Sequence, residues 1–170
     1  DINIPGGVKS IGYYTFEGCS SLASVTIPDS VTTIEEYAFK DCSSLSEVVF
    51  EKEIGIYSQL SYIEDSAFYN CSNLTSLTIP SSIFFVDKYA FAHCSNLEYV
   101  IFEENSMLCN VMDYAFAYCE SLTKIIIGNG VFNIGYSTFL CCDSLKSVTI
   151  PYSVTSIGGY AFCGCSDLTS

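Results

Sequence analysis

Residues 22–45 read LASVTIPDSVTTIEEYAFKDCSSL, and this stretch decides the fold of the whole chain. Val25, Thr26 and Ile27 alternate apolar and polar side chains, which is the period of a β-strand with one buried face. Pro28 cannot donate a hydrogen bond to a neighbouring strand, so the strand should end there. We predict that each such stretch forms a short strand, a polar turn and a return segment that leads into the next copy.

The same pattern recurs along the chain at a near-constant period. A phenylalanine returns at steps of 23, 29, 23, 25, 23 and 23 residues, followed three residues later by a cysteine and six residues later by a leucine. A repeated unit of this length predicts a solenoid, in which each unit packs mainly on its neighbours. We therefore expect residues 1–170 to form a single array of about seven units. The units are marked by Phe16, Phe39, Phe68, Phe91, Phe116, Phe139 and Phe162.

The segment that returns the chain from one strand to the next also has a regular pattern. Val31 and Ile34 are spaced to point inward, and a tight helical turn fits residues 37–39, where the small Ala38 allows close packing. A tyrosine recurs two residues before the phenylalanine, and its regularity favours stacking between units over ligand recognition. These tyrosines are Tyr14, Tyr37, Tyr89, Tyr114 and Tyr160.

Two units are longer than the rest, at the steps of 29 and 25 residues. Both lack the proline that ends the strand in other units, and Phe50-Glu51 and Phe102-Glu103 replace it. The extra residues must lie in 51–58 and 103–106. Insertions in a solenoid form loops on one side, which is often the side that binds a partner.

Composition argues against several classes of function. The chain carries 19 acidic residues against 6 lysines and no arginine, for a net charge of −13. Nucleic-acid binding needs clustered cations, and an anionic membrane surface repels such a chain. A basic partner or bound cations are attracted by the same charge, although solubility alone also accounts for it. No apolar run approaches the roughly 18 residues that cross a bilayer, so we expect no membrane insertion.

The ten cysteines do not have the spacing of a disulfide scaffold. Seven of them occupy one column of the repeat, three residues after the phenylalanine, and an odd number cannot all pair along that line. We expect reduced thiols that act as small core residues. Cys141 and Cys163 lie in adjacent units outside this column, so a disulfide between them remains open.

The consensus Leu-x-x-Val-x-Ile-Pro-x-x-Val-x-x-Ile-x-x-Tyr-Ala-Phe-x-x-Cys-x-x-Leu resembles the BspA-like leucine-rich repeat family. The match is close at 22–45 and 145–168 and covers essentially the whole chain, with Ser66 and Ser137 standing where the family has tyrosine. The resemblance implies an α/β repeat solenoid, a right-handed leucine-rich-repeat coil. Its parallel β-sheet would form the concave face, with short turns or helical turns on the convex side.

The resemblance also implies a function. Family members are largely surface or secreted proteins of host-associated bacteria and protists, and they act in adhesion and protein binding. The family has no catalytic residues that transfer to this chain. The expectation is therefore a non-catalytic module that binds a protein or glycan at the cell surface or outside the cell, with a cytoplasmic location left open. A structural or assembly spacer within a larger complex is the alternative.

Both ends of the chain fall within a unit. Residues 2–5 align with residues 25–28, and the chain stops just after Leu168. We expect a segment of a longer array, adjoined by further repeats of the parent chain; open ends that pair with other copies are the alternative.

No catalytic or metal-binding constellation stands out. His93 is the one histidine, and the neighbouring Cys94 should point to the core while His93 points to the rim, so the two cannot act as nucleophile and base. Cys163-Gly-Cys165 lacks the second ligand pair that zinc needs, and the acids of 51–53 and 103–105 lack a calcium-loop pattern. We expect no enzyme activity, cofactor or metal. Two glycosylation sequons, at Asn70 and Asn73, matter only if a eukaryote secretes the chain.

The outward face of the strands supplies the candidate contacts with a partner. Val49, Ile101 and Ile126 should face solvent on the sheet, and Tyr99 beside Ile101 resembles an interface anchor, although strand propensity alone also explains such residues. The acidic residues of the two inserted loops are further candidates for contact with a partner. The predicted partner-binding residues are Val49, Tyr99, Ile101, Ile126, Glu103 and Glu51.

Overall fold

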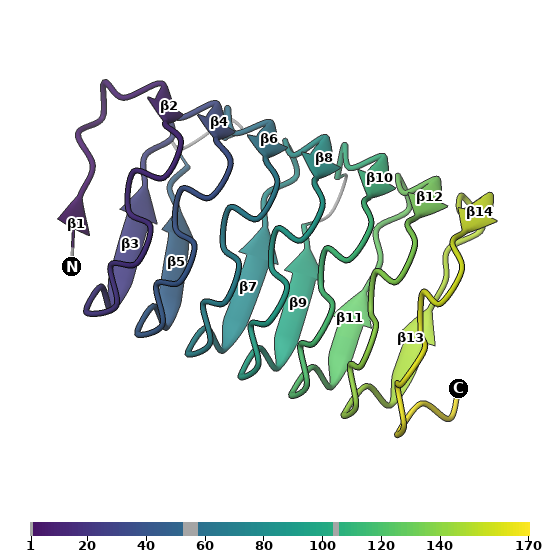
Figure 1. Cartoon of the computed structure of the whole chain (residues 1–170). Coiled ribbons are helices and arrows are strands. Elements are labelled where there is room, and N and C mark those ends of the chain that lie inside the picture. The colour runs from purple at the N-terminus through teal and green to yellow at the C-terminus, as the bar shows by residue number, and fades with distance from the viewer. Residues whose placement is uncertain (1, 53–57, 104–105) are drawn as a thin grey trace.

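The computed structural model describes residues 2–52, 58–103 and 106–170, which form coils stacked side by side in one row (Figure 1). Two series of parallel strands run along the row. The long-strand series is β1 (Ile2–Asn3), β3 (Ser24–Ile27), β5 (Glu47–Phe50), β7 (Ser76–Ile79), β9 (Tyr99–Phe102), β11 (Lys124–Ile126) and β13 (Ser147–Thr149). The short-strand series is β2 (Ser10–Ile11), β4 (Thr33–Ile34), β6 (Tyr62–Ile63), β8 (Phe85–Val86), β10 (Asn110–Val111), β12 (Asn133–Ile134) and β14 (Ser156–Ile157).

Strand register sets equivalent residues of successive units opposite one another. In the long-strand series Val25 pairs with Val48, and Val100 pairs with Ile125. All seven short strands form one sheet, in the order β14-β12-β10-β8-β6-β4-β2. A fixed register places like residues of successive coils over one another, because a slip of one residue would turn the apolar set to solvent.

The long-strand series is interrupted at one place. It divides into a sheet of β1, β3 and β5 and a sheet of β7, β9, β11 and β13, so no strand pairing joins β5 to β7. Residues 53–57 of the predicted loop 51–58 and residues 104–105 of the predicted loop 103–106 lie outside the described part of the chain.

The predicted helical turns are wrong, and with them the α/β class: the described residues contain no helix, and the fold is a parallel β-solenoid. Tyr37 and Asp41, which flank Phe39, have φ angles of 59°, in the left-handed region. The N–H of Tyr37 donates to the carbonyl of Asp65 at 3.1 Å, and that of Phe39 donates to Ala67 at 2.7 Å. A helix directs these N–H groups to carbonyls four residues earlier in the chain, whereas here they bond to the next coil.

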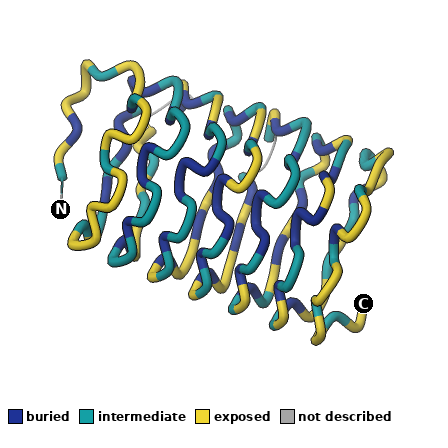
Figure 2. Tube along the Cα trace, viewed as in Figure 1, coloured by how far each residue is buried: buried dark blue, intermediate teal, exposed yellow. Residues whose placement is uncertain are grey.

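A ladder of phenylalanine rings fills the core. Phe91 is fully buried, with its ring centroid 5.2 Å from that of Phe68 and 5.4 Å from that of Phe116. The planes are almost parallel, at 5° and 7°. Figure 2 shows the same alternation of buried and exposed segments in coil after coil. The rings therefore form one interior shared by neighbouring units.

The cysteine column lies beside this ladder and bonds to it. The Sγ of Cys94 donates to the carbonyl of Phe68 at 3.3 Å, and Cys71 makes the same contact with Phe39 at 3.2 Å. All ten cysteines are free thiols. Burial raises the pKa of Cys94 to about 12, because a thiolate has no favourable solvation in this core. The column thus holds protonated thiols that join one coil to the preceding one.

Candidate binding surface

Three of the predicted contact residues form an exposed stripe on β9 and β11. Tyr99 is 48% exposed, Ile101 48% and Ile126 45%, and Ile101 is the register partner of Ile126. They face outward because successive strand residues point to opposite faces, and Val100 and Ile125 are buried on the inner one. We call Tyr99, Ile101 and Ile126 the apolar stripe. Their exposure is confirmed, and their contact with a partner stays a prediction.

Val49 is also exposed, at 41%, but the structure sets it apart from the stripe. It lies on β5, whereas Thr78 of β7 is the register partner of Ile101. The β7 coil, with Thr78, therefore lies between Val49 and the apolar stripe.

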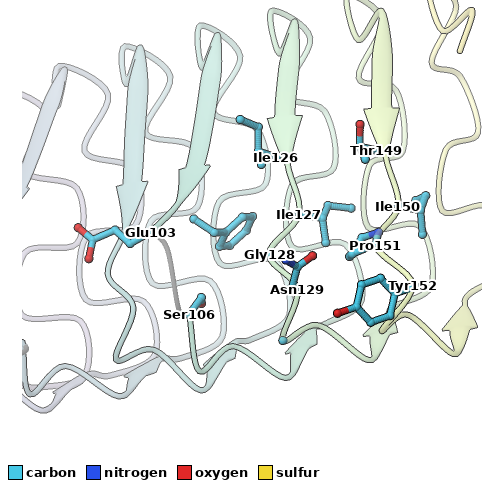
Figure 3. A pocket seen from close by; sticks show the side chains of 12 residues that line it. Glu103, Ser106, Ile126, Ile127, Gly128, Asn129, Thr149, Ile150, Pro151 and Tyr152 are labelled. Carbon is cyan, nitrogen blue, oxygen red and sulfur yellow. The ribbon is translucent and has the colours of Figure 1, made fainter.

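A hollow of about 750 Å³ adjoins the stripe where β9, β11 and β13 end (Figure 3). Ile126 belongs to both the stripe and the hollow, so the two form one continuous surface. The lining residues are Phe102, Glu103, Ser106, Ile126, Ile127, Gly128, Asn129, Gly130, Thr149, Ile150, Pro151 and Tyr152.

Two glycines of the β11 unit, Gly128 and Gly130, line this hollow. A Cβ on Gly130 would lie 2.7 Å from the carbonyl oxygen of Ser106 and 3.1 Å from that of Leu108, so only glycine lets the backbones approach this closely. Gly128 stands where Pro28, Pro80 and Pro151 end other strands, and it adds no side chain to the cavity.

Sequence reasoning missed two polar groups of the hollow. The Tyr152 side chain is 95% exposed, and Figure 3 shows its ring on the same side of the hollow as Asn129. Tyr152 follows Pro151 at the position that Asp29 and Ser81 occupy after their prolines, and this difference is a signal that could have identified it.

The two predicted acidic contacts differ in their surroundings. The Lys52 ammonium pairs with the Glu103 carboxylate, which also accepts a hydrogen bond from the Ser81 backbone N–H at 3.2 Å. Glu103 thus ties the β5 and β9 units across the unit between them. Glu51 is exposed. Ion pairs at the protein surface contribute about 0–1 kcal/mol, so this link adds little to the stability of the array.

His93 and Cys94 diverge, as the sequence predicts. The imidazole stacks on Tyr118 with 4.5 Å between ring centroids and is tilted against Tyr69 at 5.1 Å, while the Cys94 thiol bonds to Phe68 in the core. Within ranges 2–52, 58–103 and 106–170, no three His, Cys, Asp or Glu side chains gather as metal ligands. In the same ranges no helix is long and apolar enough to cross a bilayer.

Comparison with models of known protein families identifies the family of this chain. A model described as "BspA type Leucine rich repeat region" matches residues 1–59 and 50–169 in six copies. The chain therefore belongs to the BspA-type leucine-rich repeat family, as the consensus suggests. A comparison with curated proteins found no match.

Several bacterial leucine-rich repeat structures are similar in fold. A T. pallidum leucine-rich repeat protein is 26% identical with a TM-score of 0.63, over 85% of this chain and 60% of that one. The pneumococcal vaccine antigen PcpA is 26% identical with a TM-score of 0.71, over 86% and 36%. A leucine-rich cell surface protein of Faecalibacterium prausnitzii is 29% identical with a TM-score of 0.63, over 98% and 57%. The chain thus spans less than two thirds of the length of each.

Proposed function

We propose that this chain is a non-catalytic binding module that recognises a protein or glycan through the apolar stripe and the adjoining hollow. The observation that carries the proposal is the continuity between the two through Ile126. A contiguous exposed apolar surface with a polar rim is typical of an interaction site, and aromatic side chains such as Tyr99 are frequent anchors in one. Lys124 and Thr149, the neighbours of Tyr99 and Ile126 in the sheet, supply polar groups at its border.

The side chains that line the hollow could contact either a protein or a glycan ligand. The exposed Tyr152 ring offers a flat apolar surface, and the Asn129 amide beside it both donates and accepts hydrogen bonds. Such a pair accommodates a peptide side chain or the face of a sugar ring. The solenoid fold favours protein ligands, because a row of coils presents an extended surface.

The similar proteins support a role at the cell surface. One of the matched structures is described as a cell surface protein and another as a vaccine antigen. We propose that this chain works at the cell surface or outside the cell, as part of an adhesin-like protein.

The test uses Ile101→Lys with Thr26→Lys as its control, since Thr26 lies in the same outward column on the distant β3. Parent and variants are applied to an array of immobilised extracellular-matrix proteins and a glycan array, and circular dichroism verifies folding. We expect Ile101→Lys to lose binding that Thr26→Lys retains. Equal binding by Ile101→Lys and the parent would refute this placement. Growth of assemblies with concentration in sedimentation, without ligand binding, would favour the spacer role instead.

A further inference from the structure

A second hollow, of about 370 Å³, lies on the short-strand sheet and shares no residue with the apolar stripe or the first hollow. Its walls combine aromatic rings with carboxylates. This combination has no role in the proposed ligand surface or in the packing of the core. The lining residues are Tyr13, Glu36, Tyr62, Ile63, Glu64, Phe85 and Asp87.

The aromatic rings in the walls are exposed, and strand pairing in the short-strand sheet sets their positions. Tyr62 on β6 and Phe85 on β8 are register partners, and their rings stack with 6.1 Å between centroids and 9° between planes. Tyr62 is 45% exposed, Phe85 37% and Tyr13 59%. The rings face outward because the next residue of each strand, Ile63 and Val86, is fully buried. The short-strand sheet thus presents aromatic faces to solvent.

Carboxylates surround these rings in successive coils. Glu64 and Asp87 directly follow β6 and β8, and their N–H groups donate to Ile34 and Ile63 of the preceding coils at 3.0 Å. These bonds keep the two acids in adjacent positions. Partial burial first, then the charges of Glu35 and Glu36, raise the pKa of Glu64. Burial and the neighbouring carboxylates thus both disfavour the charged form of Glu64.

No lysine neutralises this charge within the described residues. The ion pairs there join Lys40 to Glu17 and Asp41, and Lys52 to Glu103. Lys88 follows Asp87, but its contact with the Asp87 carboxylate is made by the backbone N–H, at 2.7 Å. Glu64 and Asp87, both half-buried, thus have no lysine partner in the described part of the chain.

We infer that this hollow binds lysine or arginine side chains from a basic segment of a protein partner. A cation over an aromatic face is attracted by the ring, and a nearby carboxylate adds an ion pair, in a bidentate geometry when the cation is arginine. The net charge of −13 steers such a partner toward the chain. Acids recur over three successive coils, at Glu35, Glu36, Glu64, Asp65 and Asp87, so the surface matches a segment with several cations rather than one small ion.

The first test compares two sets of neutralising substitutions with equal charge change. The site set is Glu36→Gln, Glu64→Gln and Asp87→Asn; the control set is Glu98→Gln, Glu120→Gln and Asp143→Asn, at exposed positions outside the hollow. Fluorescence anisotropy measures binding of a labelled oligoarginine peptide to each protein. We expect the site set to bind about tenfold more weakly, from three ion pairs at partly exposed carboxylates of about 0.5 kcal/mol each, and the control set to change by less than about twofold.

The second test leaves charge unchanged. Tyr62→Thr and Phe85→Thr remove the rings, and threonine fits this position because Thr33 occupies it in β4. Each variant should bind the peptide about two- to fivefold more weakly, the effect of one exposed cation–π contact. Circular dichroism and thermal melting verify that the variants fold. Equal losses in the site and control sets, unchanged binding after ring removal, or no binding by the parent would each overturn the inference. Ile101→Lys should bind the peptide like the parent, which separates this site from the proposed ligand surface.

Discussion

Replacing Phe91 by alanine removes a ring from the middle of the phenylalanine ladder. Phe91 is 0% exposed and stacks on Phe68 and Phe116 at 5.2 and 5.4 Å. Truncating a buried phenylalanine costs about 3–5 kcal/mol, because transfer free energy is lost and a cavity remains. We expect the upper part of this range, since two aromatic stacks disappear together and the rigid coils on both sides cannot collapse into the space.

Urea unfolding followed by circular dichroism measures this effect as a shift in the transition midpoint at constant slope. Phe132→Ala is the matched control, because Phe132 is 53% exposed and its loss should change the free energy of unfolding by no more than about 0.5 kcal/mol. A loss below about 1 kcal/mol for Phe91→Ala, or equal losses for both variants, would refute the reasoning that the ladder stabilises the array.

Two further predictions follow from the core and the turns. The free energy of unfolding should fall as the pH rises from about 9, the ordinary pKa of a thiol, toward about 12, the raised pKa of Cys94. Over this range the unfolded chain releases thiol protons that the folded chain retains. A constant urea midpoint across this window would contradict the raised pKa of Cys94. Gly130→Ala should destabilise the chain by about 1–3 kcal/mol through the 2.7 Å approach of its Cβ to the Ser106 carbonyl. Gly6→Ala is its control, since a Cβ there meets nothing within 4 Å, and equal unfolding midpoints for the two variants would disprove the contact.

The core was predictable because its information is local and repeated. Each unit has similar inward-facing residues at the same positions. The pairing of Val100 with Ile125 and the stacking of Phe68 on Phe91 therefore follow from the repeat period alone. The stacking of the tyrosine column was predicted in the same way, and Tyr89 lies over Tyr114 with 4.8 Å between ring centroids.

The turns were not predictable because their hydrogen bonds are not local. A Tyr-Ala-Phe sequence is compatible with a helical turn, and non-glycine residues with positive φ are uncommon. Here Tyr37, Tyr89 and Tyr114 adopt φ between 54° and 59°. Bonds between coils, such as that from the Tyr89 N–H to the Asp113 carbonyl at 3.2 Å, offset this strain. Such bonds appear only once the coils are stacked.

The candidate sites also combine features that the sequence predicts with features that it does not. Strand alternation predicts that Tyr99, Ile101 and Ile126 face outward. The hollow beside them arises from turns of three units and from the missing side chain of Gly128, and the Lys52–Glu103 pair joins residues 51 positions apart. These features depend on the spacing between coils, which the sequence of one unit does not specify.

The central claim is that neighbouring coils share one interior, and a double-mutant cycle on Phe68→Ala and Phe91→Ala tests it most directly. The account predicts a coupling free energy of about 0.5–1.5 kcal/mol between these stacked rings. It predicts a coupling within about 0.5 kcal/mol of zero for Phe68→Ala with Phe139→Ala, which are separated by the coils of Phe91 and Phe116. Equal coupling in both pairs, or none between Phe68 and Phe91, would contradict it.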